Sequence, residues 1–135
     1  MECGLVATQL KLQDGETVQV KGKILPDAKE FVVNLGQDCE HLVLHFNPRF
    51  DSKGDVNTIV CNSKQKGDWQ EEQRDTNFPF ERDGKVQLSF TLLSSEIKVS
   101  LAEGHEFSFP NRLGLKTIEY IAVEGDFKVK ALKFL

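Results

Sequence analysis

The stretch Leu42–Phe50 carries the side chains with the most specific chemistry. Three polar residues, His45, Asn47 and Arg49, alternate in it with apolar ones. The apolar positions are Leu42, Leu44, Phe46 and Phe50. Since successive strand side chains point to opposite faces, this pattern predicts a β-strand with one buried and one polar face. Imidazole, amide and guanidinium groups hydrogen-bond in fixed directions, which favours a binding site there. A face that serves only solubility is the alternative.

Two further segments add to this polar surface. Val60 and Asn62 share one parity, and so do Glu72 and Arg74, which follow the single Trp69. If three antiparallel strands are neighbours, one face exposes His45, Asn47, Arg49, Asn62, Glu72 and Arg74, with Trp69 at its edge. We expect an arginine of this set to pair with Glu72 and so fix both groups before a ligand arrives. Directional polar groups beside an aromatic plate suit a sugar, which has hydroxyls and an apolar C–H face.

Catalytic and metal sites fit the same residues poorly. A glycosidase needs two carboxylates, and Glu72 has no partner of the same parity. No GxSxG-like elbow places a nucleophile near His45. A metal site would need His41, His45, His105 or Cys61 to converge, and their spacing does not indicate this. We therefore expect no enzyme activity, no metal and no cofactor.

The elements that must position these residues all read as strands. Short alternating segments rich in β-branched and aromatic residues are separated by Gly, Pro, Asp and Asn. They are Val18–Ile24, Phe31–Leu35, Thr58–Asn62, Val86–Phe90 and Glu96–Leu101. Strands at this spacing predict an all-β protein, a sandwich or a barrel. No repeat or linker divides the chain, so we expect one domain over residues 1–135.

Composition excludes several classes of partner. The 17 basic and 21 acidic residues give a net charge of −4, which does not suit a polyanion such as nucleic acid. No apolar segment is long enough to span a membrane, and the N-terminus lacks the features of a signal peptide. Three widely spaced cysteines, Cys3, Cys39 and Cys61, predict free thiols in a reducing compartment. Cys61 lies in an apolar run and should be buried, while Cys3 should oxidise most readily.

The terminal segments suggest an interface. In Phe127–Leu135, lysines alternate with core residues, but Leu132 and Phe134 have the parity of the lysines. Leu5 and Val6 add apolar residues at the other end. Either a β-bulge returns Leu132 and Phe134 to the core, or the terminal strands of two copies form a two-fold interface. We favour the homodimer, with Leu5, Val6, Leu132 and Phe134 at its interface.

The polar constellation resembles the signature of the galectin family. Residues 45–49 match H-x-N-P-R, residues 60–62 match V-x-N, and residues 69–74 match W-x-x-E-x-R. Similarity extends to Phe31–Gly36, Phe78–Phe80 and Phe107–Arg112, so it covers nearly all of the chain. The chain also resembles the one-domain members of the family, which form homodimers through their terminal strands.

The resemblance implies a jelly-roll-like sandwich of two antiparallel sheets that binds β-galactosides such as lactose and N-acetyllactosamine. The implied contacts are His45, Asn47 and Arg49 to the galactose 4-hydroxyl, Asn62 and Glu72 to the 6-hydroxyl, Trp69 under the ring, and Arg49, Glu72 and Arg74 to the next sugar. Val60 belongs to the same signature. Lys53, where relatives often have His, is a further loop contact and could favour an anionic neighbouring sugar.

The resemblance also implies a cytoplasmic protein that is exported without a signal peptide and cross-links glycoconjugates on cell surfaces or in the matrix. The alternative is an intracellular protein-interaction module with a secondary sugar site. Blocking the site with lactose distinguishes the two, because an interaction module would keep its partners.

Overall fold

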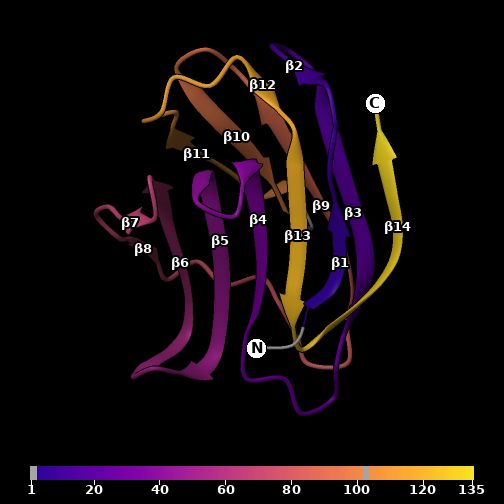
Figure 1. Ribbon diagram of the computed structural model, residues 1–135. Helices are drawn as coiled ribbons and strands as arrows, with labels where there is room; N and C mark the ends of the chain where they lie inside the picture. Colours follow the sequence, from indigo (N-terminus) through magenta and orange to yellow (C-terminus); the bar gives the residue numbers. More distant parts are fainter. Residues whose placement is uncertain (1–2, 102–103) are drawn as a thin grey trace.

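The computed structural model describes residues 3–101 and 104–135, and every regular element in them is a β-strand. All strand pairs are antiparallel, and they form two large sheets and one small one. Figure 1 shows the seven-stranded sheet in front of the five-stranded sheet. The prediction of an all-β sandwich of two antiparallel sheets is confirmed.

The seven-stranded sheet has the order β1-β13-β4-β5-β6-β7, with β8 also paired to β6. Its strands are β1 (Cys3–Ala7), β13 (Tyr120–Gly125), β4 (Phe31–Asp38), β5 (His41–Ser52), β6 (Asp55–Gln65), β7 (Asp68–Trp69) and β8 (Gln73–Asp75). The predicted polar strand is therefore β5, in the interior of the sheet between β4 and β6.

The five-stranded sheet has the order β11-β10-β9-β3-β14. Its strands are β11 (Glu106–Pro110), β10 (Glu96–Ser100), β9 (Lys85–Leu92), β3 (Thr17–Ile24) and β14 (Phe127–Phe134). A two-stranded sheet of β2 (Leu12–Gln13) and β12 (Thr117–Ile118) completes the fold. No helix among the described residues is long and apolar enough to cross a membrane.

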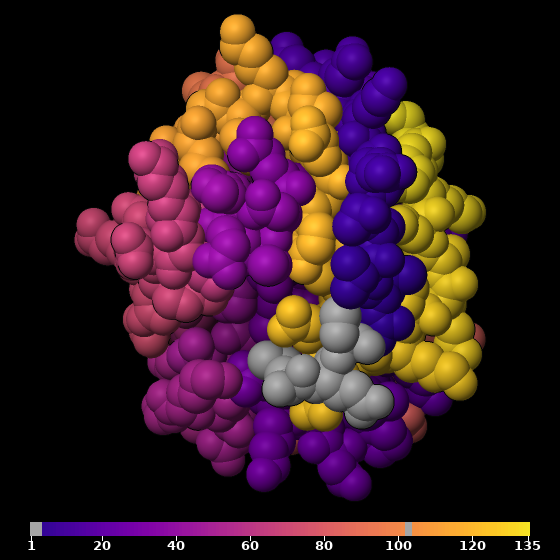
Figure 2. Space-filling view, viewed as in Figure 1, coloured from indigo at the N-terminus to yellow at the C-terminus, as the bar shows by residue number. Residues whose placement is uncertain are grey.

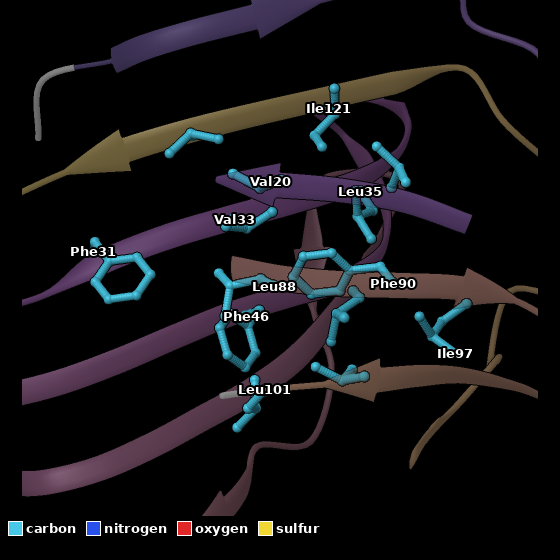
Figure 3. Packing of buried hydrophobic residues seen from close by; sticks show 14 of the residues in the cluster. Val20, Phe31, Val33, Leu35, Phe46, Leu88, Phe90, Ile97, Leu101 and Ile121 are labelled. Carbon is cyan, nitrogen blue, oxygen red and sulfur yellow. The ribbon is translucent and has the colours of Figure 1, made fainter. Parts of the chain in front are cut away.

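The core lies between the two large sheets and consists of valine, leucine and isoleucine side chains with phenylalanine rings among them (Figure 3). Phe46 of β5 and Phe90 of β9 join the sheets, with ring centroids 5.6 Å apart at 77°. Phe31 of β4 packs edge-on against Phe80, at 5.7 Å. Phe rings fill such a core without polar atoms that would need partners. Phe80 lies in a segment outside the strands and is nevertheless buried.

Two predictions about strands need correction. Residues 69–74 are not one strand: β7 ends at Trp69, β8 begins at Gln73, and Glu72 lies between them. Strand β13 was not expected, because Ile121, Ala122 and Val123 are all fully buried and show no alternation. A strand covered on both faces has a continuous apolar sequence, which carries a weak strand signal.

The alternation in β5 also breaks at its start. Val43 and Leu44 both belong to the cluster of buried apolar residues that forms the core, called the core cluster below. Leu42 is also buried but is not part of that cluster. The pairing register of β5 with β6 shifts between Leu42 and His45 of β5. The register of β5 with β4 shifts beside Gly36 of β4. This bulge places His45, Asn47 and Arg49 on the face opposite the core.

A second bulge lies in β14, where the register shifts between Val129 and Ala131. It returns Leu132 and Phe134 to the core-facing side, which is the first of the two alternatives that the sequence left open. Leu132 packs against the core, whereas Phe134 is 52% exposed at the end of the sandwich. On β1, Leu5 packs against the core and Val6 is 54% exposed.

Candidate functional site

An open groove of about 700 Å³ lies on the outer face of the seven-stranded sheet. Figure 2 views the molecule from this side, with the purple β4–β5 region between the pink β7–β8 segment and orange β13. The groove is lined by Glu30, Val32, His45, Asn47, Arg49, Lys53, Asn62, Trp69, Gln70, Glu72 and Glu124. Two predicted residues, Val60 and Arg74, do not line it. Val60 is fully buried outside the core cluster, and Arg74 lies opposite it on β8.

His45 is held in one tautomer by Asn34, its direct neighbour on β4. The distance from His45 Nδ1 to Asn34 Oδ1 is 2.7 Å. Since an amide oxygen only accepts, Nδ1 must donate, which leaves Nε2 as an acceptor. Burial and the positive charge of Arg49 lower the pKa of His45 to about 4. The imidazole is therefore neutral at pH 7, and its Nε2 can accept a hydrogen bond from a ligand hydroxyl.

Asn47, Arg49 and Arg74 form a chain of hydrogen bonds that depends on Asp55. Arg49 Nε donates to Asn47 Oδ1 at 2.9 Å, and its NH1 donates to Asp55 Oδ2 at 2.7 Å. Arg74 donates to both Asp55 oxygens at 3.1 and 3.2 Å. Arg74 also pairs with Glu72, at 3.1 Å. The hydrogen bonds from Arg74 and Arg49 lower the pKa of Asp55, which stays ionised between them.

The ion pair predicted for Glu72 is thus found with Arg74, while Arg49 pairs with Asp55. Asp55 was missed by sequence reasoning. Its signal was the Lys53-Gly54 turn, where both residues have positive φ, 51° and 86°. Such a two-residue turn sets Ser52 opposite Asp55 and folds Asp55 back toward Arg49.

Glu30 was also missed, and it changes the surroundings of Lys53. Lys53 Nζ and Ser52 Oγ both donate to Glu30 Oε2, at 2.5 and 2.6 Å. Asn47 Nδ2 donates to Glu30 Oε1 at 3.1 Å. Burial alone would raise the pKa of Glu30, but the hydrogen bonds from Lys53, Ser52 and Asn47 outweigh it and lower it to about 2. The charge of Lys53 is therefore balanced by an ionised carboxylate. Nothing in the sequence around Glu30 indicated this contact.

Asn62 on β6 is fixed by its neighbours and by Arg112. Asn62 Oδ1 accepts from Ser63 N at 2.8 Å, and Asn62 Nδ2 donates to Gln70 O at 3.3 Å. Arg112 NH1 donates to Ser63 Oγ at 3.1 Å and to Glu71 O at 2.8 Å. These bonds hold residues 70–72 against β6, although that segment is not a strand. Gln70 and Arg112 are thus positioning residues that the strand pattern did not reveal.

Trp69 supplies an aromatic plate at the edge of the groove, as predicted, and is 50% exposed. The ring centroids of His45 and Trp69 are 4.6 Å apart at 61°. Lys64 Nζ lies over the indole at 4.9 Å. These contacts hold the indole at the end of the row of hydrogen-bonding groups.

The arrangement favours binding over catalysis. A general acid needs a carboxyl group with a raised pKa, and the pKa values of Glu30 and Asp55 are both lowered. Cys61 is buried, and burial and the charge of Asp75 raise its pKa to about 12, so it is no nucleophile. Cys39 is exposed, and the side chain of Cys3 lies outside the described part of the chain. No group of three or more potential metal ligands occurs among residues 3–101 and 104–135.

Comparisons with known proteins give the chemical class. A family model described as galactoside-binding lectin matches residues 4–134. The 16 kDa beta-galactoside-binding lectin of Gallus gallus is 60% identical over 134 residues, which are 99% of each chain. Among solved structures, CG-16, a homodimeric agglutinin from chicken liver, has a TM-score of 0.95 at 60% identity and covers 97% of this chain and 98% of its own. A complex of toad ovary galectin with thio-digalactose has a TM-score of 0.95 at 40% identity and covers 100% of both chains.

Proposed function

Because this chain belongs to the galactoside-binding lectin family, we propose that the groove over β4–β8 is its β-galactoside site. The protein is a lectin of the galectin type and not an enzyme. The observation that carries the site assignment is the chain of bonds from Asn47 through Arg49 and Asp55 to Arg74, beside Trp69. Groups held in this way need no reordering when a sugar binds, which reduces the entropic cost of binding.

The hydrogen-bond donors and acceptors that remain unused at one end of the groove suit a single hydroxyl. Asn47 uses both amide hydrogens on Glu30 Oε1 and Phe31 O, so only its Oδ1 remains to face a ligand. His45 offers Nε2 as an acceptor, and Arg49 retains NH2 as a donor. A hydroxyl that donates to His45 or Asn47 and accepts from Arg49 satisfies this set, and we assign it to the axial 4-hydroxyl of galactose.

The other contacts follow along the groove. Asn62 and Glu72 are assigned to the 6-hydroxyl, Trp69 to the apolar face of galactose, and Arg49, Glu72 and Arg74 to the next sugar. An equatorial 4-hydroxyl, as in glucose, would leave buried groups unpaired at a cost of about 1 to 3 kcal/mol each. This mismatch is the basis of selectivity for galactose.

The affinity for one disaccharide should be modest. Five or six hydrogen bonds at about 1 to 3 kcal/mol each must offset about 4 kcal/mol or more of lost freedom. The balance corresponds to a Kd of roughly 10 µM to 1 mM. Tight binding therefore requires two sites that bind the same multivalent glycan at once.

A homodimer supplies two such sites, and the chicken liver relative is a homodimeric agglutinin. In this chain the terminal strands β1 and β14 are the edges of the two large sheets and lie side by side (Figure 1). Val6 and Phe134 are exposed there. We propose pairing of these edges in a dimer that cross-links galactoside-bearing glycoconjugates. Its presence both in the cytoplasm and outside the cell stays a prediction.

Calorimetric titration with lactose, with cellobiose as the control, tests the site. We expect one lactose per chain, a Kd in the range above and no binding of cellobiose. Trp69→Ala should lose lactose binding while keeping the wild-type melting temperature. Binding of cellobiose, or unchanged binding of lactose by Trp69→Ala, would contradict the assignment.

A further inference from the structure

The outer face of the five-stranded sheet carries a dense group of lysines, on the far side of the sandwich from the galactoside groove. They come from β3, β9 and β14. The lysine face consists of Lys21, Lys23, Lys85, Lys128, Lys130 and Lys133. A chain with a net charge of −4 thus concentrates positive charge on one surface. The overall charge had predicted no polyanionic partner, and it hides this uneven distribution.

The strand register brings these charges together. Lys128 lies directly opposite Lys23, and Lys23 lies directly opposite Lys85. Three lysines therefore form one row across three neighbouring strands. Directly opposed side chains are about 5 Å apart at Cβ, and like charges at that distance destabilise a sheet. The row therefore lowers the stability of the sheet, and burial of apolar side chains gives no reason for its presence.

The positive charges are mostly uncompensated. Lys23 pairs with Asp83 at 3.1 Å. For the other five lysines, no carboxylate among residues 3–101 and 104–135 lies within ion-pair distance. A side-chain contact with Lys133 and repulsion between the two ammonium groups lower the pKa of Lys21. An anion at this surface would relieve the repulsion.

Protection of a sheet edge does not account for the pattern. Lysines on an edge strand discourage pairing with other chains, whereas β14 is an edge strand that we propose to pair with a second copy. Lys21, Lys23 and Lys85 lie on β3 and β9, which are interior strands with neighbours on both sides. Edge protection does not explain these three.

Four of the six lysines also line a broad open depression of about 710 Å³. It is lined by Lys21, Gly22, Lys23, Lys85, Val86, Gln87 and Lys130. Val86 belongs to the buried core, and a Cβ on Gly22 would meet the core ring of Phe127, so neither residue places a side chain in the depression. The ammonium groups therefore stand around a low floor. An extended chain of negative groups could lie across the strands here.

The chemistry of the face selects among polyanions. It offers ammonium groups but no arginine for bidentate phosphate contacts and no aromatic ring for base stacking, which disfavours nucleic acid. Its strands have paired backbones, and the exposed large apolar side chains of the described residues lie elsewhere, which disfavours a peptide or a membrane. We propose that the lysine face binds a sulfated polysaccharide chain, independently of the galactoside groove on the opposite face.

The test is titration with a heparin-derived decasaccharide in saturating lactose, over a series of salt concentrations. The variant Lys85→Gln/Lys128→Gln/Lys130→Gln removes three exposed lysines of the face. The matched control, Lys11→Gln/Lys66→Gln/Lys116→Gln, makes the same change of net charge with exposed lysines elsewhere. Lactose titration of each protein checks the fold and tests the proposed function separately.

We expect wild type and control to bind the decasaccharide equally and the lysine-face variant to bind at least about tenfold more weakly. The slope of log K against log salt should fall by about 2 to 3 in that variant, since each contact releases about one counterion. Equal loss in both variants, displacement by lactose, or equal binding of a desulfated decasaccharide would overturn the proposal. Tighter binding of a DNA duplex, polyglutamate or anionic vesicles than of the decasaccharide would also overturn it.

Discussion

Asp55 shows how one residue outside the recognised pattern can organise the groove. Its two carboxylate oxygens accept from Arg49 and from Arg74, so a single charge orients both guanidinium groups. Arg49 is 6% exposed, and a buried guanidinium without its carboxylate carries a large desolvation penalty. The sugar contacts that we propose for Arg49 and Arg74 therefore depend on Asp55.

We predict that Asp55→Asn weakens lactose binding about tenfold or more, because an amide has one acceptor oxygen in place of two, turns an NH2 group toward an arginine donor and carries no charge. That loss corresponds to about 1.4 kcal/mol, a typical size for a hydrogen bond to a charged group. Titration calorimetry measures it. Asp51→Asn is the matched control, since Asp51 is exposed on the same hairpin. Wild-type affinity in Asp55→Asn would remove Asp55 from the site.

His45 predicts a pH dependence of stability. Its pKa is lowered from 6.5 to about 4 in the folded state. Between these values the unfolded chain binds a proton that the folded chain does not, so stability falls as pH falls through this window. From pH 6.5 to 5 the loss from His45 should be about 1.5 kcal/mol. Urea unfolding at matched protein concentration measures it.

The variant His45→Gln isolates this effect from other titrating groups. Its stability should fall less than that of wild type between pH 7 and 5. Lactose affinity of the wild type should stay level down to about pH 5 and decline as Nε2 becomes protonated nearer pH 4. Identical pH profiles for the two proteins would show that His45 does not titrate as described.

At the scale of elements, the bulge beside Gly36 decides which face of β5 carries the polar row. A Cβ built on Gly36 would lie 2.0 Å from His41 O and 2.8 Å from Leu42 Cα, both on β5. The backbones of β4 and β5 approach too closely here for any other residue. Glycine at this position therefore permits the register shift that precedes His45.

We predict that Gly36→Ala lowers the melting temperature by more than about 5 °C, since backbone atoms must move by an ångström or more to admit the methyl group. Gly4→Ala is the control, because the nearest atoms to a Cβ on Gly4 are 3.7 Å away. Differential scanning calorimetry compares the two. Equal melting temperatures for Gly36→Ala and wild type would mean that the two strands separate at little cost.

At the scale of the whole molecule, the two proposed binding surfaces lie on opposite faces. The seven-stranded sheet carries the groove that we assign to galactosides, and the five-stranded sheet carries the lysine face. The edges formed by β1 and β14 lie together on one side. Pairing of two copies along these edges would leave the grooves of both copies open, because the grooves lie over β4–β8.

We predict that Val6→Asp weakens the dimer and abolishes agglutination while each chain still binds lactose. Val6 is 54% exposed on β1, so a charge there should disturb an interface and spare the fold. Sedimentation equilibrium measures the dimer constant. Val56→Asp, at a position 63% exposed on β6, is the control for adding a charge to an exposed valine. An unchanged dimer constant in Val6→Asp would move the interface away from β1.

Leu132 should not be used for that test. It packs against the core after the bulge in β14, so its loss would lower stability whether or not a dimer forms. The sequence offered two interpretations of Leu132 and Phe134, a bulge that returns them to the core and an interface between two copies. The register shift confirms the bulge, and the interface stays a prediction.

The sequence by itself determined the fold class, the groove-facing row on β5 and the family. These follow from local properties: alternation defines a strand face, and His45, Asn47 and Arg49 carry their chemistry in their side chains. The spacing of Val60, Asn62, Trp69, Glu72 and Arg74 identified the signature because it is a fixed pattern along the chain.

Only the tertiary structure decided how those groups are held and what else the surface offers. Four residues reach the site from other strands or across turns: Asn34, Glu30, Asp55 and Arg112. No local sequence pattern predicts such contacts. Two bulges, at Gly36 and Lys130, reverse the parity that alternation assumes. The lysine face likewise exists only through strand register, because pairing brings together charges that are far apart in the chain.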